Sequence, residues 1–134
     1  MVAGTVAAAV ATTLLTAAPA SAQTWWDDPN SCTSTATAVQ RDVSNRTVQV
    51  RYGRCGGSQY GWGRILNYGS SDYIRFEIDL NGDRVWDLAE TRRASSRNYT
   101  SGYLTSSSSA RAFRACYVTS LSGTCNSSNA TAWW

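Results

Sequence analysis

Residues 72–90 read DYIRFEIDLNGDRVWDLAE, the stretch with the clearest structural pattern in the chain. Apolar side chains alternate with polar ones over residues 74–80, which is the pattern of a β-strand with one buried face. Residues 84–91 are suited to a partner strand. The dipeptide Asn81-Gly82 lies between the two segments and is a preferred pair for a two-residue type I′ turn. The stretch therefore predicts a β-hairpin.

The same stretch has the spacing of a calcium-binding loop. Five residues with side-chain oxygens occupy positions 1, 3, 5, 9 and 12 of a twelve-residue segment, positions from which an EF-hand binds calcium. They are Asp79, Asn81, Asp83, Asp87 and Glu90. Position 6, where an EF-hand has Gly, is Arg84, and the segment before the loop has the period of a strand. A plain hairpin, with Asp79 facing Arg84 across the strands, is the simpler interpretation. A calcium-binding hairpin loop of another type is the alternative.

Other segments extend the β pattern along the chain. Residues 46–52 alternate strictly, Gly56-Gly57 then turns the chain, and residues 59–66 resume the strand pattern. A short strand is expected within residues 99–104. Residues 110–119 are expected to form a last strand or a helical turn.

One segment has a different spacing. Within residues 33–42 and just beyond, Ala36, Val39 and Val43 would fall on one face of a helix. We therefore expect a mainly β fold: a small antiparallel β-domain, sandwich or barrel-like, with one short helix and two disulfides.

The N-terminal segment has the features of a secretory signal peptide. Residues 1–22 are small and apolar, and they end in Ala20-Ser21-Ala22, which matches a signal-peptidase site. The apolar part is too short for a membrane anchor. We expect a signal peptide at residues 1–22, a single secreted β-domain at residues 23–134, an extracellular location and no membrane attachment after cleavage.

Four cysteines in a short secreted chain predict disulfides. They are Cys32, Cys55, Cys116 and Cys125. Three connectivities are possible, and the local one, which joins the first two cysteines and the last two, is preferred. A zinc site is the poorer alternative, because the chain has no CxxC pair and no His.

The composition excludes several kinds of chemistry. The 12 basic residues are all Arg, and the chain has no His. Nucleophiles activated by His or Lys, Schiff bases and P-loops are therefore excluded. Paired carboxylates remain, and Glu77 and Asp79 would share one strand face at the spacing of a glycoside hydrolase pair. The net charge of +3 is too small to indicate a nucleic-acid partner, although Arg and aromatic residues alternate over residues 52–68.

The chain is rich in aromatic residues, with six Trp and seven Tyr. Two tryptophan pairs lie near the two ends of the expected mature chain, and a fifth tryptophan lies between glycines. We expect ligand binding by these side chains: Trp25, Trp26, Trp62, Trp133 and Trp134. Exposed indole rings are flat and apolar, which suits them to stack on sugar rings. The alternative is that the two ends meet and form a small core of their own.

The chain contains a set of short motifs: Cys32 followed by Ala36-Thr37, the run Val48-Gln49-Val50-Arg51-Tyr52, then Cys55, and finally Trp62-Gly63-Arg64-Ile65. This set resembles the YjfA family of small secreted proteins, which are common in actinomycetes. The resemblance implies a secreted fold, with no established activity, and supports a bridge between Cys32 and Cys55.

Together these features predict a secreted domain without catalysis and without a required cofactor. Its expected role is extracellular binding of a polysaccharide, such as that of a cell wall, or of another secreted protein. A secreted effector, such as an antimicrobial toxin component or an enzyme inhibitor, is one alternative. A small carboxylate-dependent hydrolase is the other.

Overall fold

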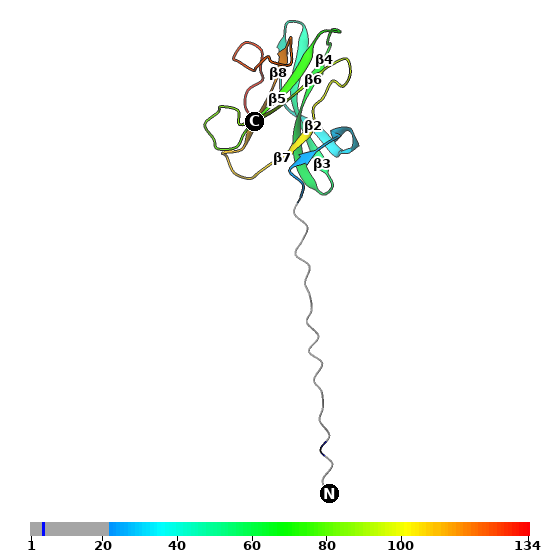
Figure 1. Ribbon diagram of the computed structural model, residues 1–134, viewed down its shortest axis with the longest axis vertical. Coiled ribbons are helices and arrows are strands. Elements are labelled where there is room, and N and C mark those ends of the chain that lie inside the picture. The colour runs from blue at the N-terminus through cyan, green and yellow to red at the C-terminus, as the bar shows by residue number, and fades with distance from the viewer. Residues whose placement is uncertain (1–3, 5–21) are drawn as a thin grey trace.

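The computed structural model describes residue 4 and residues 22–134 (Figure 1). The expected signal peptide lies outside the described residues, apart from Gly4 and Ala22. In the part of the chain that is described, no helix combines the length and the hydrophobicity needed to cross a membrane.

Residues 25–118 form eight strands and one short 3-10 helix. In chain order these are β1 (Trp25–Trp26), η1 (Pro29–Ser31), β2 (Thr33–Val43), β3 (Arg46–Cys55), β4 (Ser58–Leu66), β5 (Tyr73–Asp79), β6 (Leu88–Arg93), β7 (Gly102–Leu104) and β8 (Ala112–Val118). The prediction of a mainly β domain with one short helical element is therefore confirmed. The segment 110–119, left open between strand and helical turn, contains strand β8.

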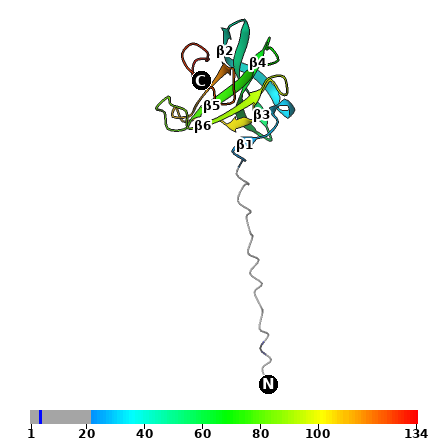
Figure 2. The same ribbon diagram turned by 45° about the horizontal axis from the view of Figure 1, so that its top comes forward.

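The strands make two antiparallel sheets that pack face to face as a sandwich. The five-stranded sheet has the order β1-β7-β4-β3-β2, and the three-stranded sheet has the order β6-β5-β8. β8 packs against β3 and β4, and β5 packs against β4, so the two sheets lie against each other (Figures 1 and 2). Each sheet therefore offers one inner face to the core between them.

The prediction of a helix within residues 33–42 is wrong, because this segment belongs to strand β2. Its register against β3 shifts between the pairs Thr37–Arg51 and Val39–Val50, so Ala38 is an extra residue on β2. Such a bulge changes the period of two into a spacing of three. Ala36 and Val39 consequently lie on the same face of a strand, although their spacing is that of a helix.

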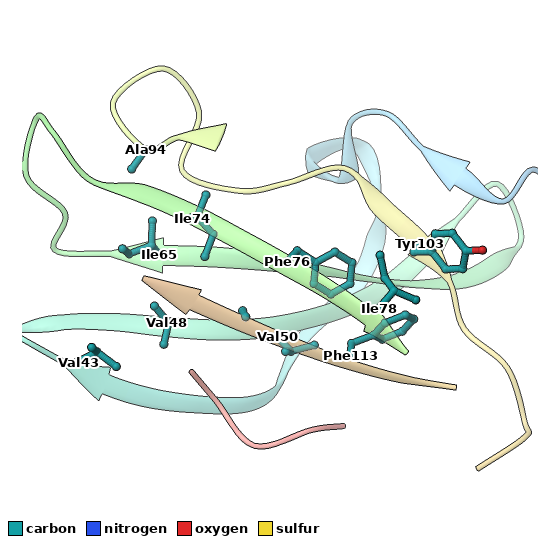
Figure 3. Packing of buried hydrophobic residues seen from close by; sticks show 11 residues of the cluster. Val43, Val48, Val50, Ile65, Ile74, Phe76, Ile78, Ala94, Tyr103 and Phe113 are labelled. Atoms are coloured by element: carbon teal, nitrogen blue, oxygen red, sulfur yellow. The ribbon is translucent and has the colours of Figure 1, made fainter. Parts of the chain in front are cut away.

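The core lies between the two sheets. Figure 3 shows its side chains converging from both of them. The five-stranded sheet contributes Val48, Val50 and Ile65, and β5 contributes Ile74, Phe76 and Ile78, all fully buried. The alternation in residues 74–80 thus reports the buried face of β5 correctly, except that Leu80 is exposed beyond the end of the strand. Burial of such side chains contributes about 1.5–3 kcal/mol each to folding.

Both disulfides have the local pairing that the sequence predicts. Cys32 is bonded to Cys55, and Cys116 is bonded to Cys125. The second bridge lies in a small cluster with Val118 and Ala130 at one edge of the three-stranded sheet. It ties the last segment of the chain to β8.

That last segment lies along β8 as an additional extended stretch. The backbone of Phe113 donates to and accepts from Trp134, at 2.7 and 2.8 Å, and Thr131 donates to the carbonyl of Ala115 at 2.9 Å. An isolated bridge pairs Cys116 with Ala130. The segment therefore covers the outer edge of β8 and brings Trp134 to the core.

Candidate functional site

The five expected binding tryptophans occupy three different environments. Trp25 and Trp134 keep 36% and 37% of their surface exposed. Trp26 and Trp133 are half-buried. Trp62 is only 4% exposed. The structure therefore does not bring the five together into one surface.

The two half-buried tryptophans are held by neighbouring side chains. Trp26 packs on Tyr60 with ring centroids 5.5 Å apart, and its indole nitrogen donates to the hydroxyl of Ser31 at 3.3 Å. The guanidinium of Arg114 lies over the Trp133 ring at 4.6 Å. These rings contribute to packing, with little surface left for a ligand.

The two exposed tryptophans are joined by a row of aromatic rings through the end of the sandwich. Trp25 meets Tyr103 edge to face at 4.9 Å, Tyr103 lies 6.4 Å from Phe113, and Phe113 lies 6.0 Å from Trp134. Trp134 then stacks on Tyr52 at 5.2 Å. We call these five residues the aromatic row. Residues near both ends of the described domain meet in it, so the expectation of a core closed by the two ends also has a structural basis.

A hollow lies beside Trp134 on this row. It has a volume of about 220 Å³ and is lined by Gln59, Thr105, Ser106, Arg111, Phe113 and Trp134. Arg111 is held over the Tyr103 ring, with its guanidinium carbon 5.1 Å from the centroid. The hydroxyl of Thr105 donates to the side-chain oxygen of Gln59 at 3.0 Å. An apolar ring beside fixed polar groups is the usual composition of a small ligand site.

The sequence did not indicate Tyr103 and Phe113 as members of this surface. Phe113 lies between Ala112 and Arg114, Tyr103 lies between Gly102 and Leu104, and only pairing of β7 with β1 and β4 brings Tyr103 into line. Gly61 makes the row possible, because a side chain there would meet the Phe113 ring at 2.8 Å. The glycines on either side of Trp62 are the sequence signal of such a close approach, because a glycine inside a strand often marks one.

The β5–β6 hairpin has a long loop in place of the expected two-residue turn. The strands pair as far as Ile78 and Leu88, and residues 80–87 are exposed. The carboxylate of Asp79 accepts hydrogen bonds from the backbone nitrogens of Asn81, Gly82 and Arg84. These bonds fold the chain around Asp79, so the prediction of a type I′ turn at Asn81-Gly82 is wrong.

Three of the five expected calcium ligands come together in this loop. Carboxylate oxygens of Asp79, Asp83 and Asp87 lie within 4.8 Å of one another. Asn81 uses its side-chain oxygen to accept the backbone N–H of Asp83 at 3.2 Å. Glu90 lies on β6, where it bonds Arg92 at 3.2 Å and the backbone of Ser101. The five expected ligands therefore do not form one site, because Asn81 and Glu90 are bonded elsewhere.

Arg84 supplies a positive charge within the loop. Its guanidinium donates to Asp79 at 2.8 Å, and the buried Asp79 carboxylate makes no other ion pair among the described residues. Burial raises the pKa of Asp79, but the hydrogen bonds from the Arg84 side chain and from the loop backbone outweigh it and bring the pKa to about 2. The expected pairing of Asp79 with Arg84 is present, but it is made within the loop and not between paired residues of two strands.

The carboxylates considered for hydrolysis are engaged inside the fold. Glu77 is fully buried and accepts from Arg75 at 2.7 Å and from Arg114 at 2.8 Å. The backbone of Cys125 also donates to it at 3.3 Å. A carboxylate that donates or accepts a proton in glycoside hydrolysis must reach the substrate, which this arrangement does not favour.

Comparison of the chain with protein-family models, with curated proteins and with solved structures finds no match.

Proposed function

We propose that the domain is a secreted, non-catalytic module that binds polysaccharide through the two exposed tryptophans of the aromatic row. The observation that carries this proposal is the exposure of Trp25 and Trp134, at 36% and 37%, on rings otherwise fixed by aromatic neighbours. A fixed, exposed indole loses little conformational entropy when a ligand stacks on it.

The surroundings of Trp134 suit a sugar. The hollow beside it adds the guanidinium of Arg111 and the polar side chains of Gln59 and Thr105 to the apolar rings. A pyranose offers an apolar face to stacking and hydroxyls to such polar groups. A volume of about 220 Å³ is below the ~300–1,000 Å³ of drug-sized pockets, which favours contact with a residue of a longer chain.

Secretion is supported by covalent chemistry. All four cysteines are bonded in disulfides, which persist in oxidising compartments. The signal-peptide pattern of residues 1–22 and the resemblance to a family of secreted actinobacterial proteins point the same way. We place the domain outside the cell.

The absence of catalysis is part of the proposal. Glu77 and Asp79 are both buried and both paired with Arg. The chain also has no His and no Lys that could act as a general base. The carboxylates instead stabilise the three-stranded sheet and its loop.

Co-sedimentation tests the proposal. The protein, residues 23–134, is mixed with insoluble bacterial cell wall and with chitin, and the bound fraction is measured for the wild type, Trp134→Ala and Trp25→Ala. We expect the wild type to pellet and both variants to lose about tenfold in affinity, as stacked aromatic anchors do.

Trp86→Ala is the matched control, because Trp86 is 42% exposed on the β5–β6 loop and is not part of the row. An equal loss in this variant, or no pelleting of the wild type, would contradict a binding surface at the aromatic row. A protein partner would then be sought by pull-down with the same variants.

A further inference from the structure

A small cleft lies on the outer face of the five-stranded sheet, away from the aromatic row. It has a volume of about 140 Å³, and the residues that matter for its chemistry are Asn30, Thr35, Arg51, Trp62, Arg64 and Tyr99. Successive residues of a strand point to opposite faces, so Arg51 lies on the other side of β3 from Tyr52 of the row. The cleft and the row are therefore separate surfaces.

Trp62 is buried beneath the cleft because Gly53 leaves room for it. A side chain at Gly53 would come within 3.2 Å of the Trp62 ring and 2.9 Å of the Thr35 methyl group. Trp62 also packs with Tyr60, Cys55 and Tyr99. The ring is thereby fixed as an apolar wall between two arginines.

Arg51 is held in place by hydroxyl groups alone. Its two terminal nitrogens donate to Thr37 at 2.8 Å and to Thr35 at 3.3 Å. Its Nε is buried without a hydrogen-bond partner among the described residues. A buried guanidinium donor with no acceptor is costly unless an acceptor completes it.

Arg64 is oriented by a chain of amides. Its Nε donates to the side-chain oxygen of Gln49 at 2.8 Å, and Gln49 in turn donates to Gln40 at 2.9 Å. Within residues 22–134, the two terminal nitrogens of Arg64 make no hydrogen bond that meets the usual distance limits. They remain as a two-pronged donor of the kind that binds carboxylate or phosphate.

The two arginines line the same cleft, and neither forms an ion pair among the described residues. All five ion pairs of the described residues involve other arginines. Burial and the charge of Arg51 both lower the pKa of Arg64. The acid at the rim, Asp28, is engaged by the Tyr99 hydroxyl at 2.9 Å and by the Asn30 backbone at 3.0 Å.

We propose that this cleft binds an anionic group, a carboxylate or a phosphate, between Arg51 and Arg64 and against Trp62. Such a group would neutralise two like charges and accept from the terminal nitrogens of Arg64, which have no partner among the described residues. The cleft volume is several times the ~10–15 Å³ that a single water requires, so a compact anion fits while a whole polymer does not. The site would hold one charged substituent of a larger molecule.

The test uses NMR titration of the protein with inorganic phosphate and, separately, with glucuronate, at constant ionic strength kept with chloride. The reporter is the indole Nε1–H of Trp62. We expect a saturable shift with at least one of the two anions, and about a tenfold weaker affinity in Arg64→Gln and in Arg51→Gln. Which anion binds tells whether the group is a phosphate ester or an acidic sugar.

Arg54→Gln is the control, because Arg54 is exposed on β3, the strand of Arg51, and among the described residues its side chain donates only to the carbonyl of Gly57, at 3.4 Å. Arg64→Lys keeps the charge and loses the two-pronged donor, so it should also weaken binding. A similar loss in Arg54→Gln, full binding by Arg64→Lys, or no shift with either anion would overturn the proposal. Because the tryptophans of the row lie elsewhere, this result is independent of sedimentation with polysaccharide.

Discussion

Arg84 closes the β5–β6 loop on Asp79 twice, through its backbone nitrogen and through its guanidinium, each at 2.8 Å. To do so it adopts a left-handed conformation, with φ of 58°. This conformation costs a side chain about 1–2 kcal/mol, which the buried contacts to Asp79 offset. The loop thus carries its own cation.

Calcium should have little effect on this loop. Arg84 neutralises Asp79, and Glu90 is bonded elsewhere, so Asp83 and Asp87 alone are weak ligands. We expect the melting temperature to be the same in calcium and in chelator, measured by circular dichroism. A higher melting temperature in calcium than in chelator, lost in the Asp83→Asn variant, would instead indicate a metal site at Asp79, Asp83 and Asp87.

Asp79 should give the protein an acid-sensitive stability. Its pKa is about 2 in the folded protein, against 3.8 for the free side chain. A lowered pKa means that the stabilisation is complete above about pH 4 and is lost as the pH falls towards 2. Urea unfolding should show that Asp79→Asn is less stable than the wild type at pH 5, with a difference that shrinks at lower pH.

A difference between wild type and Asp79→Asn that is constant with pH would contradict this account. Asp83→Asn serves as the control for the substitution itself, because Asp83 is exposed in the same loop and accepts only from the backbone of Val85.

Glu77→Gln should destabilise the protein strongly. The change leaves Arg75 and Arg114 without their common carboxylate inside the fold, and one terminal nitrogen of Arg75 is already without a partner. Breaking a buried pair of this kind costs about 3–5 kcal/mol, measurable by urea denaturation. Glu90→Gln, which removes a partly exposed pair, should cost about 1 kcal/mol or less. Equal costs for the two variants would mean that Glu77 is not the centre of the sheet's charge network.

Gly61→Ala should disturb the aromatic row. The new methyl group would lie 2.8 Å from the Phe113 ring, so this ring must move, and Trp134 packs on it with ring centroids 6.0 Å apart. Overpacking of this kind costs about 1–3 kcal/mol, and the fluorescence of Trp134 should change with it. Gly69→Ala is the control, because its methyl group would meet nothing closer than 3.6 Å. Unchanged stability in Gly61→Ala would show that the end of the sandwich is loosely packed.

Local patterns predicted the parts of the fold that depend on neighbours in sequence. Ile74, Phe76 and Ile78 face the core as their alternation indicates. The turn at Gly56-Gly57 sets Cys55 opposite Ser58, and the same register places Arg51 beside Trp62. The sequence thus predicts the neighbouring strands that carry Arg51, Trp62 and Arg64, but it did not predict that neither arginine would form an ion pair among the described residues.

The failures arose where one side chain or one extra residue overrode a local rule. The carboxylate of Asp79 accepts hydrogen bonds from the backbone of Asn81 and Gly82, and these bonds replace the two-residue turn that the dipeptide would otherwise form. A bulged residue, Ala38, gave a strand the spacing of a helix. The aromatic row was also not predicted, because Tyr103 and Phe113 are brought together only by contacts between distant segments.

The bulge in β2 has a consequence for the behaviour of the protein in concentrated solution. β2 is the edge of the five-stranded sheet, and an edge strand can add a strand from another molecule. Two register shifts, between Thr33 and Ala36 and between Thr37 and Val39, together with the left-handed Ser34, interrupt its regular row of donors and acceptors. The same irregularity that disguises the strand in the sequence thereby protects the domain from growing into sheet aggregates.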